Sequence, residues 1–415
     1  MISFPETASL LPEVRTFADG SKVYVMPSES TELVKLDLLH EAGSAYQPQL
    51  LCAAAANRLY SLASSMMSAA EVAEFMDYRG IIVEHGPDIL CCRTSFYFLR
   101  RYFDELLPVL CGLLAKPAFP QEDFDAFRDK RRQELQEKQL KSDEVARRMF
   151  YEALFGAEHP LGRSAEPGDA DRLLRDVVAS FFAERYSEMQ VVVAGNVDDG
   201  LVEGLHTLPG ITGSFNLASI PSLATQLPAL PANRLIKTLP SAVQTTVRVG
   251  RVLPLRWDDP DYARLMLAVT MLGGYFGSRL MSNLREDKGY TYGVSARTQI
   301  FRGVIVFFVT ANVAAGSAEA AEVEIRRELR RLCDEPVGDD ELQLVRNVMA
   351  GDFIRSVDGI FERSERLCSM MATGVDERLT DNLRAVLQSI TPEDLQRVSR
   401  RWLDPDTMLY CFAGA

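Results

Sequence analysis

Residues 273–292 read GGYFGSRLMSNLREDKGYTY, and this stretch decides how the rest of the chain is interpreted. Glycines at Gly273, Gly274 and Gly277 predict a turn whose backbone can approach another surface closely. A short helix is expected after the turn, and Gly289 is expected to follow its last residue, where a left-handed backbone ends many helices. A strand is expected next, so the stretch is a turn, a helix and a strand in close succession.

Arg285 and Tyr292 are the candidate functional residues of this stretch. Ser278 is expected to cap the helix, Arg285 lies near its end, and Tyr292 falls on the strand that follows. A guanidinium and a phenol hydroxyl can both donate to one carbonyl oxygen, so the pair could stabilise a developing oxyanion. The alternative is structural, with an arginine that completes a helix end and a tyrosine that packs on a strand. The residues alone leave both interpretations open.

Size and composition are those of a globular protein with more than one domain. The chain has 415 residues, of which 47% are hydrophobic and 25% are charged. The formal net charge of −13 argues against a nucleic-acid or anionic-membrane partner, because phosphate binding needs clustered lysine and arginine. The longest apolar stretch, 303–316, is too short to cross a bilayer.

Cysteine usage and the N-terminal residues indicate the compartment. Seven cysteines is an odd number, and most lie in apolar runs, which predicts buried free thiols in a reducing environment. The first residues lack the basic and apolar regions of a signal peptide. We therefore expect a cytoplasmic protein.

Hydrophobic periodicity predicts strands and helices in two successive passes, with long helices segregated from groups of strands. This segregation favours an α+β fold over an alternating parallel α/β fold. In the first pass, strands are expected at 22–26, 33–39, 81–84, 89–98 and 189–194, and helices at 50–67, 68–77, 101–115, 122–141, 144–155 and 169–186. In the second pass, strands are expected at 242–253, 292–298, 303–312 and 407–412, and helices at 261–272, 318–333, 339–355, 360–372, 376–389 and 392–402.

The two passes can be aligned with each other. The strand at 89–94 matches 305–310, and the apolar strand at 191–195 matches 408–414. The offset between matched segments stays at about 216 to 219 residues, which favours an internal duplication. Two unrelated α+β domains are the alternative.

The predicted domain organisation follows from this alignment. Residues 1–207 form an N-terminal domain and residues 236–415 form a C-terminal domain. Between them, residues 208–235 contain four prolines with glycine, serine and threonine, which is the composition of a linker.

Familiar catalytic motifs are missing. The four histidines are His40, His85, His159 and His206, and none stands one helical turn from another, so the zinc motifs HExxH and HxxEH do not occur. His85 and His159 are interpreted as turn residues. A GxSxG elbow, a P-loop and a dinucleotide fingerprint are also missing, and the glycines at 273–277 lack the Lys-Ser/Thr ending of a phosphate loop.

The chain resembles the pitrilysin/insulinase family of zinc peptidases, most closely its short bacterial members and the mitochondrial processing peptidase subunits. The most specific segment is 278–292, which combines Ser-Arg-Leu, Leu-Arg-Glu and Gly-Tyr-Thr-Tyr. Further family-like segments are 68–77, 119–134, 155–163 with Glu-His-Pro-Leu-Gly, and 191–198 with Val-Ala-Gly-Asn-Val-Asp. The resemblance implies two homologous α/β-sandwich domains in tandem, which agrees with the duplication.

The resemblance also implies that the metal site is degenerate. Catalytic members carry His-x-x-Glu-His on the first long helix of the N-terminal domain, and this motif falls on Ala54, Asn57 and Arg58. Glu134 stands near the register of the third ligand. We therefore expect no cofactor in this chain.

The family's two-chain enzymes imply the function. One subunit carries the zinc motif and the other carries an Arg/Tyr pair, which matches Arg285 and Tyr292. This chain would be the second kind: it would bind the peptide substrate with this pair, with Gly273, Gly274 and Gly277 as a lip near the peptide, while a homologous HxxEH-bearing partner holds zinc. Two alternatives remain, a structural scaffold without any role in turnover and a self-sufficient enzyme with an unrecognised site. In isolation the chain could form a homodimer.

Overall fold

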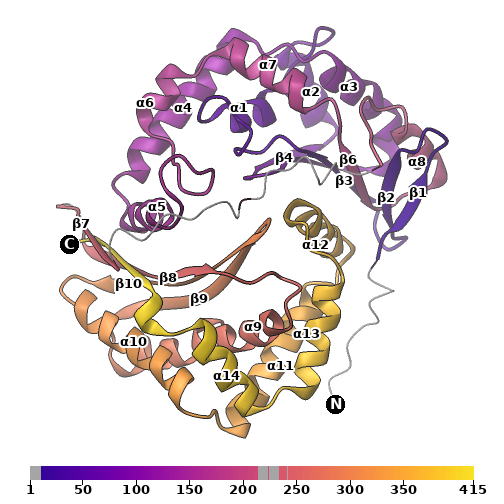
Figure 1. Cartoon of the computed structure of the whole chain (residues 1–415). Coiled ribbons are helices and arrows are strands. Elements are labelled where there is room, and N and C mark those ends of the chain that lie inside the picture. Colours follow the sequence, from indigo (N-terminus) through magenta and orange to yellow (C-terminus); the bar gives the residue numbers. More distant parts are fainter. Residues whose placement is uncertain (1–10, 214–222, 224–232, 241) are drawn as a thin grey trace.

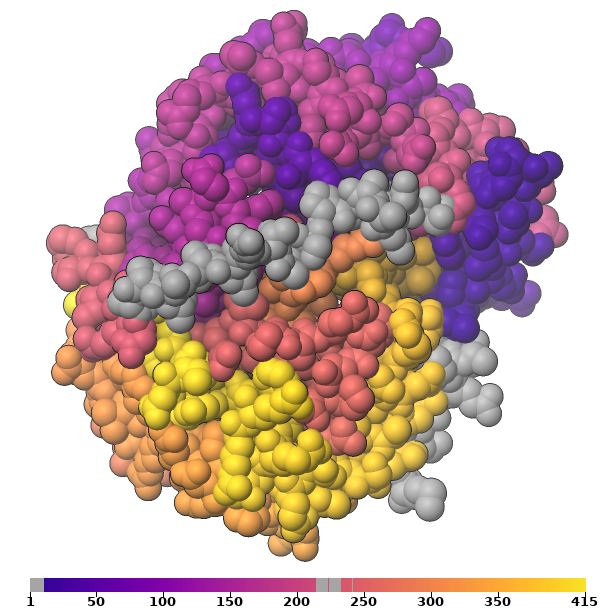
Figure 2. All heavy atoms as spheres, in the orientation of Figure 1, coloured from indigo at the N-terminus to yellow at the C-terminus, as the bar shows by residue number. Residues whose placement is uncertain are grey.

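A computed structural model describes residues 11–213, 223, 233–240 and 242–415 of the chain. The molecule has two halves, each built on one β-sheet whose outer face is covered by helices (Figure 1). In the space-filling view, the N-terminal half, coloured indigo to magenta, meets the C-terminal half, coloured orange to yellow, along a broad front (Figure 2). The α+β fold with two domains is confirmed.

The N-terminal sheet has six strands. All neighbouring strands run antiparallel except β2 and β6, which are parallel. In spatial order the strands are β1 (Glu13–Thr16), β2 (Lys22–Pro27), β6 (Gln190–Gly195), β3 (Leu33–His40), β5 (Cys92–Leu99) and β4 (Ile82–Pro87).

The C-terminal sheet has five strands and repeats this plan without a counterpart of β1. Its single parallel pair, β7 and β11, occupies the place of β2 and β6. In spatial order the strands are β7 (Arg234–Thr238), β11 (Leu409–Gly414), β8 (Gln244–Leu253), β10 (Val304–Ala314) and β9 (Thr291–Phe301). The repeated order of strands agrees with the internal duplication inferred from the sequence.

Each sheet buries its outer face under its own helices and forms one hydrophobic core per half. The N-terminal helices are α1 (Cys52–Leu59), α2 (Ala69–Tyr78), α3 (Phe103–Ala115), α4 (Gln121–Lys138), α6 (Pro167–Arg172), α7 (Arg175–Arg185) and α8 (Asp199–Leu205), with a 3₁₀ turn η2 (Arg100–Tyr102) before α3. The C-terminal helices are α9 (Pro260–Gly273), η3 (Met281–Asp287), α10 (Ala318–Asp334), α11 (Asp339–Arg355), α13 (Arg378–Ser389) and α14 (Pro392–Trp402), with a 3₁₀ turn η4 (Pro405–Thr407) before β11.

The inner faces of the sheets are covered by exchanged helices. Helix α5 (Ser142–Phe155) belongs to the N-terminal half but packs on β8 and β11, and α12 (Ile360–Thr373) belongs to the C-terminal half but packs on β2, β3 and β6. A third hydrophobic core lies between the sheets and includes Phe150 from α5, Leu367 from α12 and Val192 from β6. The two halves therefore share one core.

A buried ionic network also joins the halves. Lys35 on β3 has no exposed side-chain surface, and its Nζ lies 3.0 Å from Asp37 Oδ2 and 2.5 Å from Glu365 Oε1 of α12. It also donates to Ser364 Oγ at 3.0 Å. Arg93 on β5 pairs with the other Glu365 oxygen at 2.5 Å. Because Lys35 is the centre of the network, one N-terminal lysine holds a C-terminal helix in place.

Most expected elements are present, and the differences have local causes. The helix expected over 50–67 ends at Leu59, after which the chain turns and Ser64 forms a β-bridge with Pro117. The helix expected over 169–186 is divided, because Leu173 adopts an extended backbone and is buried in the core. Short elements were missed: the mostly exposed edge strands β1 and β7, and α8, which Asp198 caps through Leu201 N.

Two further expectations can be compared with the structure. Most of the predicted linker, 208–235, lies outside the described residues, so the domain limits stay predictions. All seven cysteines are free thiols, and six of them are buried. Within the ranges that the structure describes, no helix is long and apolar enough to cross a membrane.

Candidate functional site

Arg285 lies on η3, a π-helix of seven residues. Single π-helical turns are uncommon and often occur at functional sites. Ser278 directly precedes the first helical residue and its carbonyl accepts from Ser282 N, but its buried Oγ has no hydrogen-bond partner, so the expected side-chain cap does not form. The expected helix end is present, since Gly289 has φ +64° and Lys288 N donates to Asn283 O at 3.0 Å.

The buried face of η3 is fixed to the neighbouring helices. Asn283 Nδ2 donates to Glu324 and Glu328 of α10 at 2.8 and 2.9 Å. Just before η3, Arg279 forms a two-pronged ion pair with Glu341 of α11, with both distances 2.7 Å. These contacts hold the helix rigidly while its opposite face is exposed.

Arg285 and Tyr292 lie on that exposed side. The Tyr292 side chain is 87% exposed, and Arg285 is exposed as well. The guanidinium carbon of Arg285 lies 4.9 Å from the ring centre of Phe276, which is itself 62% exposed. Among the described residues, neither the Arg285 nor the Tyr292 side chain accepts or donates a hydrogen bond or joins an ion pair. The purely structural interpretation therefore rests on the packing of Arg285 against Phe276, without a side-chain hydrogen bond or ion pair among the described residues.

Gly273, Gly274 and Gly277 lie at the end of α9 and in the turn that follows it. Gly273 is the last residue of α9 and is buried; a Cβ there would lie 2.6 Å from Ala296 N on β9. Gly274 ends the helix, where a Cβ would meet Thr270 Cα at 2.6 Å. Gly274 and Gly277 are exposed and stand in the turn itself, whereas Gly273 is buried. The close approach is to the chain's own strand and helix, and the lip near a peptide stays a prediction.

The positions matched to the zinc motif line one cavity. Ala54 and Arg58 of α1 and Glu134 of α4 surround a space of about 320 Å³, together with residues of β4. The structure thus brings together three of the four positions that sequence matching placed at a metal site. Apolar groups, including Leu59 and Phe127, form part of its wall.

Asn57, the fourth position, points into the protein. It is fully buried, and its Nδ2 donates to Thr94 Oγ1 on β5 at 3.1 Å. This hydrogen bond connects α1 to the sheet on which the helix packs. It is not available as a base at the cavity.

Arg58 is held by a histidine from the edge strand. Its Nη1 lies 3.1 Å from His85 Nδ1, and His85 Nε2 lies 2.8 Å from Ser61 Oγ. Burial, with the nearby Arg58 charge, lowers the pKa of His85 to about 4. The imidazole is therefore neutral at pH 7, and Nδ1 accepts from Arg58 while Nε2–H donates to Ser61. His85 was expected in a turn, but it lies within β4.

These residues do not fit zinc. A zinc site needs three or four histidine, cysteine or carboxylate ligands. Here the guanidinium of Arg58 stands in the wall of the cavity, and Glu134 is ion-paired with Arg131 at 2.7 Å. Within the described ranges, no three histidine, cysteine, aspartate or glutamate residues stand where they could hold a metal ion.

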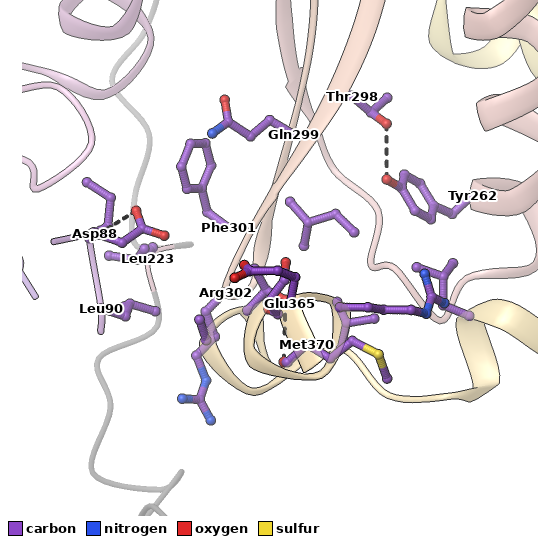
Figure 3. Close-up of a pocket in the computed structure, with 18 of the residues that line it drawn as sticks. Asp88, Leu90, Leu223, Tyr262, Thr298, Gln299, Phe301, Arg302, Glu365 and Met370 are labelled. Atoms are coloured by element: carbon purple, nitrogen blue, oxygen red, sulfur yellow. Dashed lines mark hydrogen bonds between the residues drawn. The ribbon is translucent and has the colours of Figure 1, made fainter. Parts of the chain in front are cut away.

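A larger cavity lies between the halves. It measures about 820 Å³ and is bordered by Asp88 and Leu90 on one side and by the ends of β9 and α12 on the other. Figure 3 shows Asp88 and Leu90 on one side of this space, and Phe301 of β9 with Glu365 and Met370 of α12 on the other. Its lining is mostly apolar, as in many ligand-binding clefts.

Several residues at these sites could not be found from sequence. Phe276 reads as an ordinary loop aromatic, and only the fold places it beside Arg285. Lys130 reads as one charge among many on an exposed helix, but it borders the cavity next to Arg58. His85 offered a weak signal, because it was one of only four histidines in the chain.

Comparison with known protein families supports a relation to peptidases. Residues 172–349 match a family model described as the peptidase M16 inactive domain. The match contains both Arg285 and Tyr292.

Relatives in sequence are named as zinc proteases or as an inactive homologue. An uncharacterized zinc protease of Streptomyces coelicolor is 24% identical over 319 residues, covering 74% of this chain and 69% of that protein. A probable inactive metalloprotease of Bacillus subtilis, YmfF, is 22% identical over 158 residues, covering 38% of this chain and 36% of that protein.

Solved structures share the fold over nearly the whole chain. A peptidase M16 inactive domain from Pseudomonas fluorescens has a TM-score of 0.84 at 19% identity, covering 97% of this chain and 98% of that one. A Helicobacter pylori protease has a TM-score of 0.84 at 17% identity, covering 98% and 100%. A chain of complex III2 from Candida albicans has a TM-score of 0.75 at 10% identity, covering 97% and 95%.

The sequence matches, the duplicated two-sheet fold and the cavity without a zinc ligand set agree with one another. Residues 172–349 are similar to the peptidase M16 inactive domain, and nearly the whole chain shares its fold with M16-like structures, so the chain resembles M16 peptidases and their inactive relatives.

Proposed function

We propose that the chain is a non-catalytic, peptide-binding subunit of a heteromeric zinc metallopeptidase. The observation that carries the proposal is the state of Arg285 and Tyr292: both are exposed and unpaired among the described residues, on elements whose buried faces are fixed. Exposed donors on a rigid support are suited to a group outside the chain.

In this proposal a homologous partner with His-x-x-Glu-His supplies the metal and the general base. Arg285 donates its N–H groups to the carbonyl oxygen of the peptide, and the Tyr292 hydroxyl donates to the same oxygen. Both hydrogen bonds strengthen as negative charge develops on that oxygen, which lowers the barrier. Phe276, stacked against Arg285, limits the positions that the guanidinium can take.

The test is turnover by the reconstituted pair. The tagged full-length chain is used to isolate its HxxEH-bearing homologue, and the two are purified and mixed. Arg285→Ala should lower kcat/KM by about 30-fold, the equivalent of about 2 kcal/mol for a lost oxyanion donor. Arg355→Ala is the control, because Arg355 is an exposed arginine whose ion pair, among the described residues, is to Asp352 in the same helix.

A structural scaffold is the second candidate. It is favoured by the similarity of fold to a chain of complex III2 from Candida albicans. A scaffold would associate stably with its partner, but Arg285→Ala and Tyr292→Phe would leave all turnover unchanged. That outcome would refute the peptide-binding proposal and retain the assembly.

A further inference from the structure

The cavity at the degenerate metal position has the properties of a small binding site. Its volume of about 320 Å³ is near the lower end of ligand pockets, enough for a side chain or a chain end. It lies between α1, α4 and the edge strand β4, and Ala54 leaves its base open. A protein that had only lost a metal would more simply fill this space with larger apolar side chains.

Apolar and charged groups divide the walls of the cavity. Leu59, Leu62 and Phe127 form an apolar side that would accommodate aliphatic carbon. The polar side carries three basic residues, Arg58, Lys130 and Arg131, against two acidic ones, Asp123 and Glu134. A ligand that fits both sides has an aliphatic stem and an anionic end.

Two of the basic groups form no ion pair among the described residues, and with the Asp123 carboxylate the polar side keeps an excess of one positive charge. Arg131 is neutralised by Glu134 at 2.7 Å. The neighbour of Arg58 is the neutral imidazole of His85, which orients the guanidinium without cancelling its charge. Lys130 has no ion pair among the residues that the structure describes. An oriented arginine beside a free lysine binds a carboxylate well, because hydrogen bonds between ionised groups are the strong ones.

The edge of the sheet leads directly to the cavity. β4 is the edge strand of the N-terminal sheet, and among the described strands it pairs with β5 alone, so its outer edge has no strand partner there. His85 and Pro87 of β4 line the cavity, and Ile82 at the other end of the strand is 60% exposed. An extended peptide can add to such an edge through main-chain hydrogen bonds, with pockets selecting its side chains.

We propose that this cavity is a carboxylate-recognition site for an extended peptide, with Arg58 and Lys130 as the binding residues. The carboxylate is either an acidic side chain or the C-terminus of the peptide. The position that the resemblance assigns to zinc thus selects substrates instead of cleaving them. The proposal rests on the peptide-binding role proposed above, but it concerns the N-terminal half and requires no partner chain.

Binding is measured by fluorescence anisotropy with the full-length chain alone. Four labelled peptides share one β-forming sequence. The two peptides of the first pair differ only at the C-terminus, which is a free carboxylate in one and an amide in the other. The two peptides of the second pair both end in an amide and differ at one central residue, which is glutamate in one and glutamine in the other. The variants are Arg58→Gln and Lys130→Gln, and Lys138→Gln is the matched control, because it removes the same charge from the exposed end of the same helix, α4.

One carboxylate peptide should bind at least about tenfold more tightly than its neutral twin, as charge-assisted hydrogen bonds require. If the first pair of peptides shows the difference in affinity, the carboxylate is the C-terminus; if the second pair shows it, the carboxylate is an acidic side chain. Arg58→Gln should abolish the preference and Lys130→Gln should reduce it, whereas Lys138→Gln should not change it. Equal binding of the twins, no binding by any peptide, or an unchanged preference in Arg58→Gln would overturn the proposal. None of these results depends on turnover, so they are separate from the test of Arg285 in the reconstituted pair.

Discussion

Replacing Lys35 by methionine should destabilise the whole molecule, because Lys35 is the centre of the ionic network that joins the halves. Its side chain has no exposed surface, and neither a water molecule nor another lysine can easily take its place. Methionine keeps most of the aliphatic volume, so the change removes the charge with little effect on packing.

The magnitude follows from the partners that are left behind. Asp37 is 1% exposed, and removing one partner of a buried ion pair typically costs about 3–5 kcal/mol. The cost should fall at the low end, about 3 kcal/mol, because Ser95 Oγ still donates to Asp37 at 2.5 Å and Arg93 Nε stays 3.9 Å away. Glu365 adds little, since its side chain is 45% exposed and retains Arg93.

The assay is equilibrium urea denaturation, with the free energy of unfolding taken from the transition that reports both halves. Lys237→Met is the control, since Lys237 is an exposed lysine in the edge strand β7 and should change the free energy by less than about 0.5 kcal/mol. Hydrogen exchange of α12 should also accelerate in Lys35→Met, because the helix loses its link to β3.

A double variant separates the charge effect from packing. In Lys35→Met with Asp37→Asn, no uncompensated charge is buried, so the double variant should be more stable than Lys35→Met alone. The reasoning is wrong if Lys35→Met costs less than about 1 kcal/mol, or if the two substitutions cost the sum of their separate effects.

Three further predictions concern local features. His40 is buried, and its pKa is lowered to about 3, so below pH 6.5 the unfolded chain binds this proton first and His40 should contribute a fall in stability of about 1.4 kcal/mol per pH unit. His85 adds to the slope in the same range, and the slope should be reduced by the His40 share in His40→Gln when denaturation is followed against pH. Ser68→Ala removes the capping box of α2 and should cost about 1 kcal/mol in urea denaturation, and a cost near zero would show that this helix end is held by packing alone. Gly273→Ala should lower the thermal midpoint, because its Cβ would lie 2.6 Å from Ala296 N, whereas Gly293→Ala, with no atom within 4 Å, should change it little.

Hydrophobic periodicity predicted most helices and strands, because each of them has one buried face. The apolar residues of that face recur at regular spacing within the element's own sequence. The capping box at Ser68 was correct for the same reason, since all of its atoms come from four consecutive residues. Errors occurred where a distant contact decides the backbone. Leu173 ends a helix because the core takes its side chain in an extended conformation, and nothing in the adjacent residues indicates this.

The candidate sites were predictable only in part. Matching motifs identified Arg285 and Ala54 by position, but not what surrounds them. Phe276 and His85 act through contacts across the fold, and sequence spacing has no information about such contacts. Asn57 illustrates the limit, because the same position could have faced the cavity or the sheet, and only packing against Thr94 decides.

The exchange of α5 and α12 between the halves determines how the chain behaves when it is divided into two fragments. Either half expressed alone would present the inner face of its sheet bare, because the helix that covers that face is encoded in the other half. Each fragment would tend to aggregate, whereas the two produced together in one cell would cover each other's sheets and reassemble. The chain is therefore suited to fragment complementation, in which two separate genes restore one folded protein without a covalent connection.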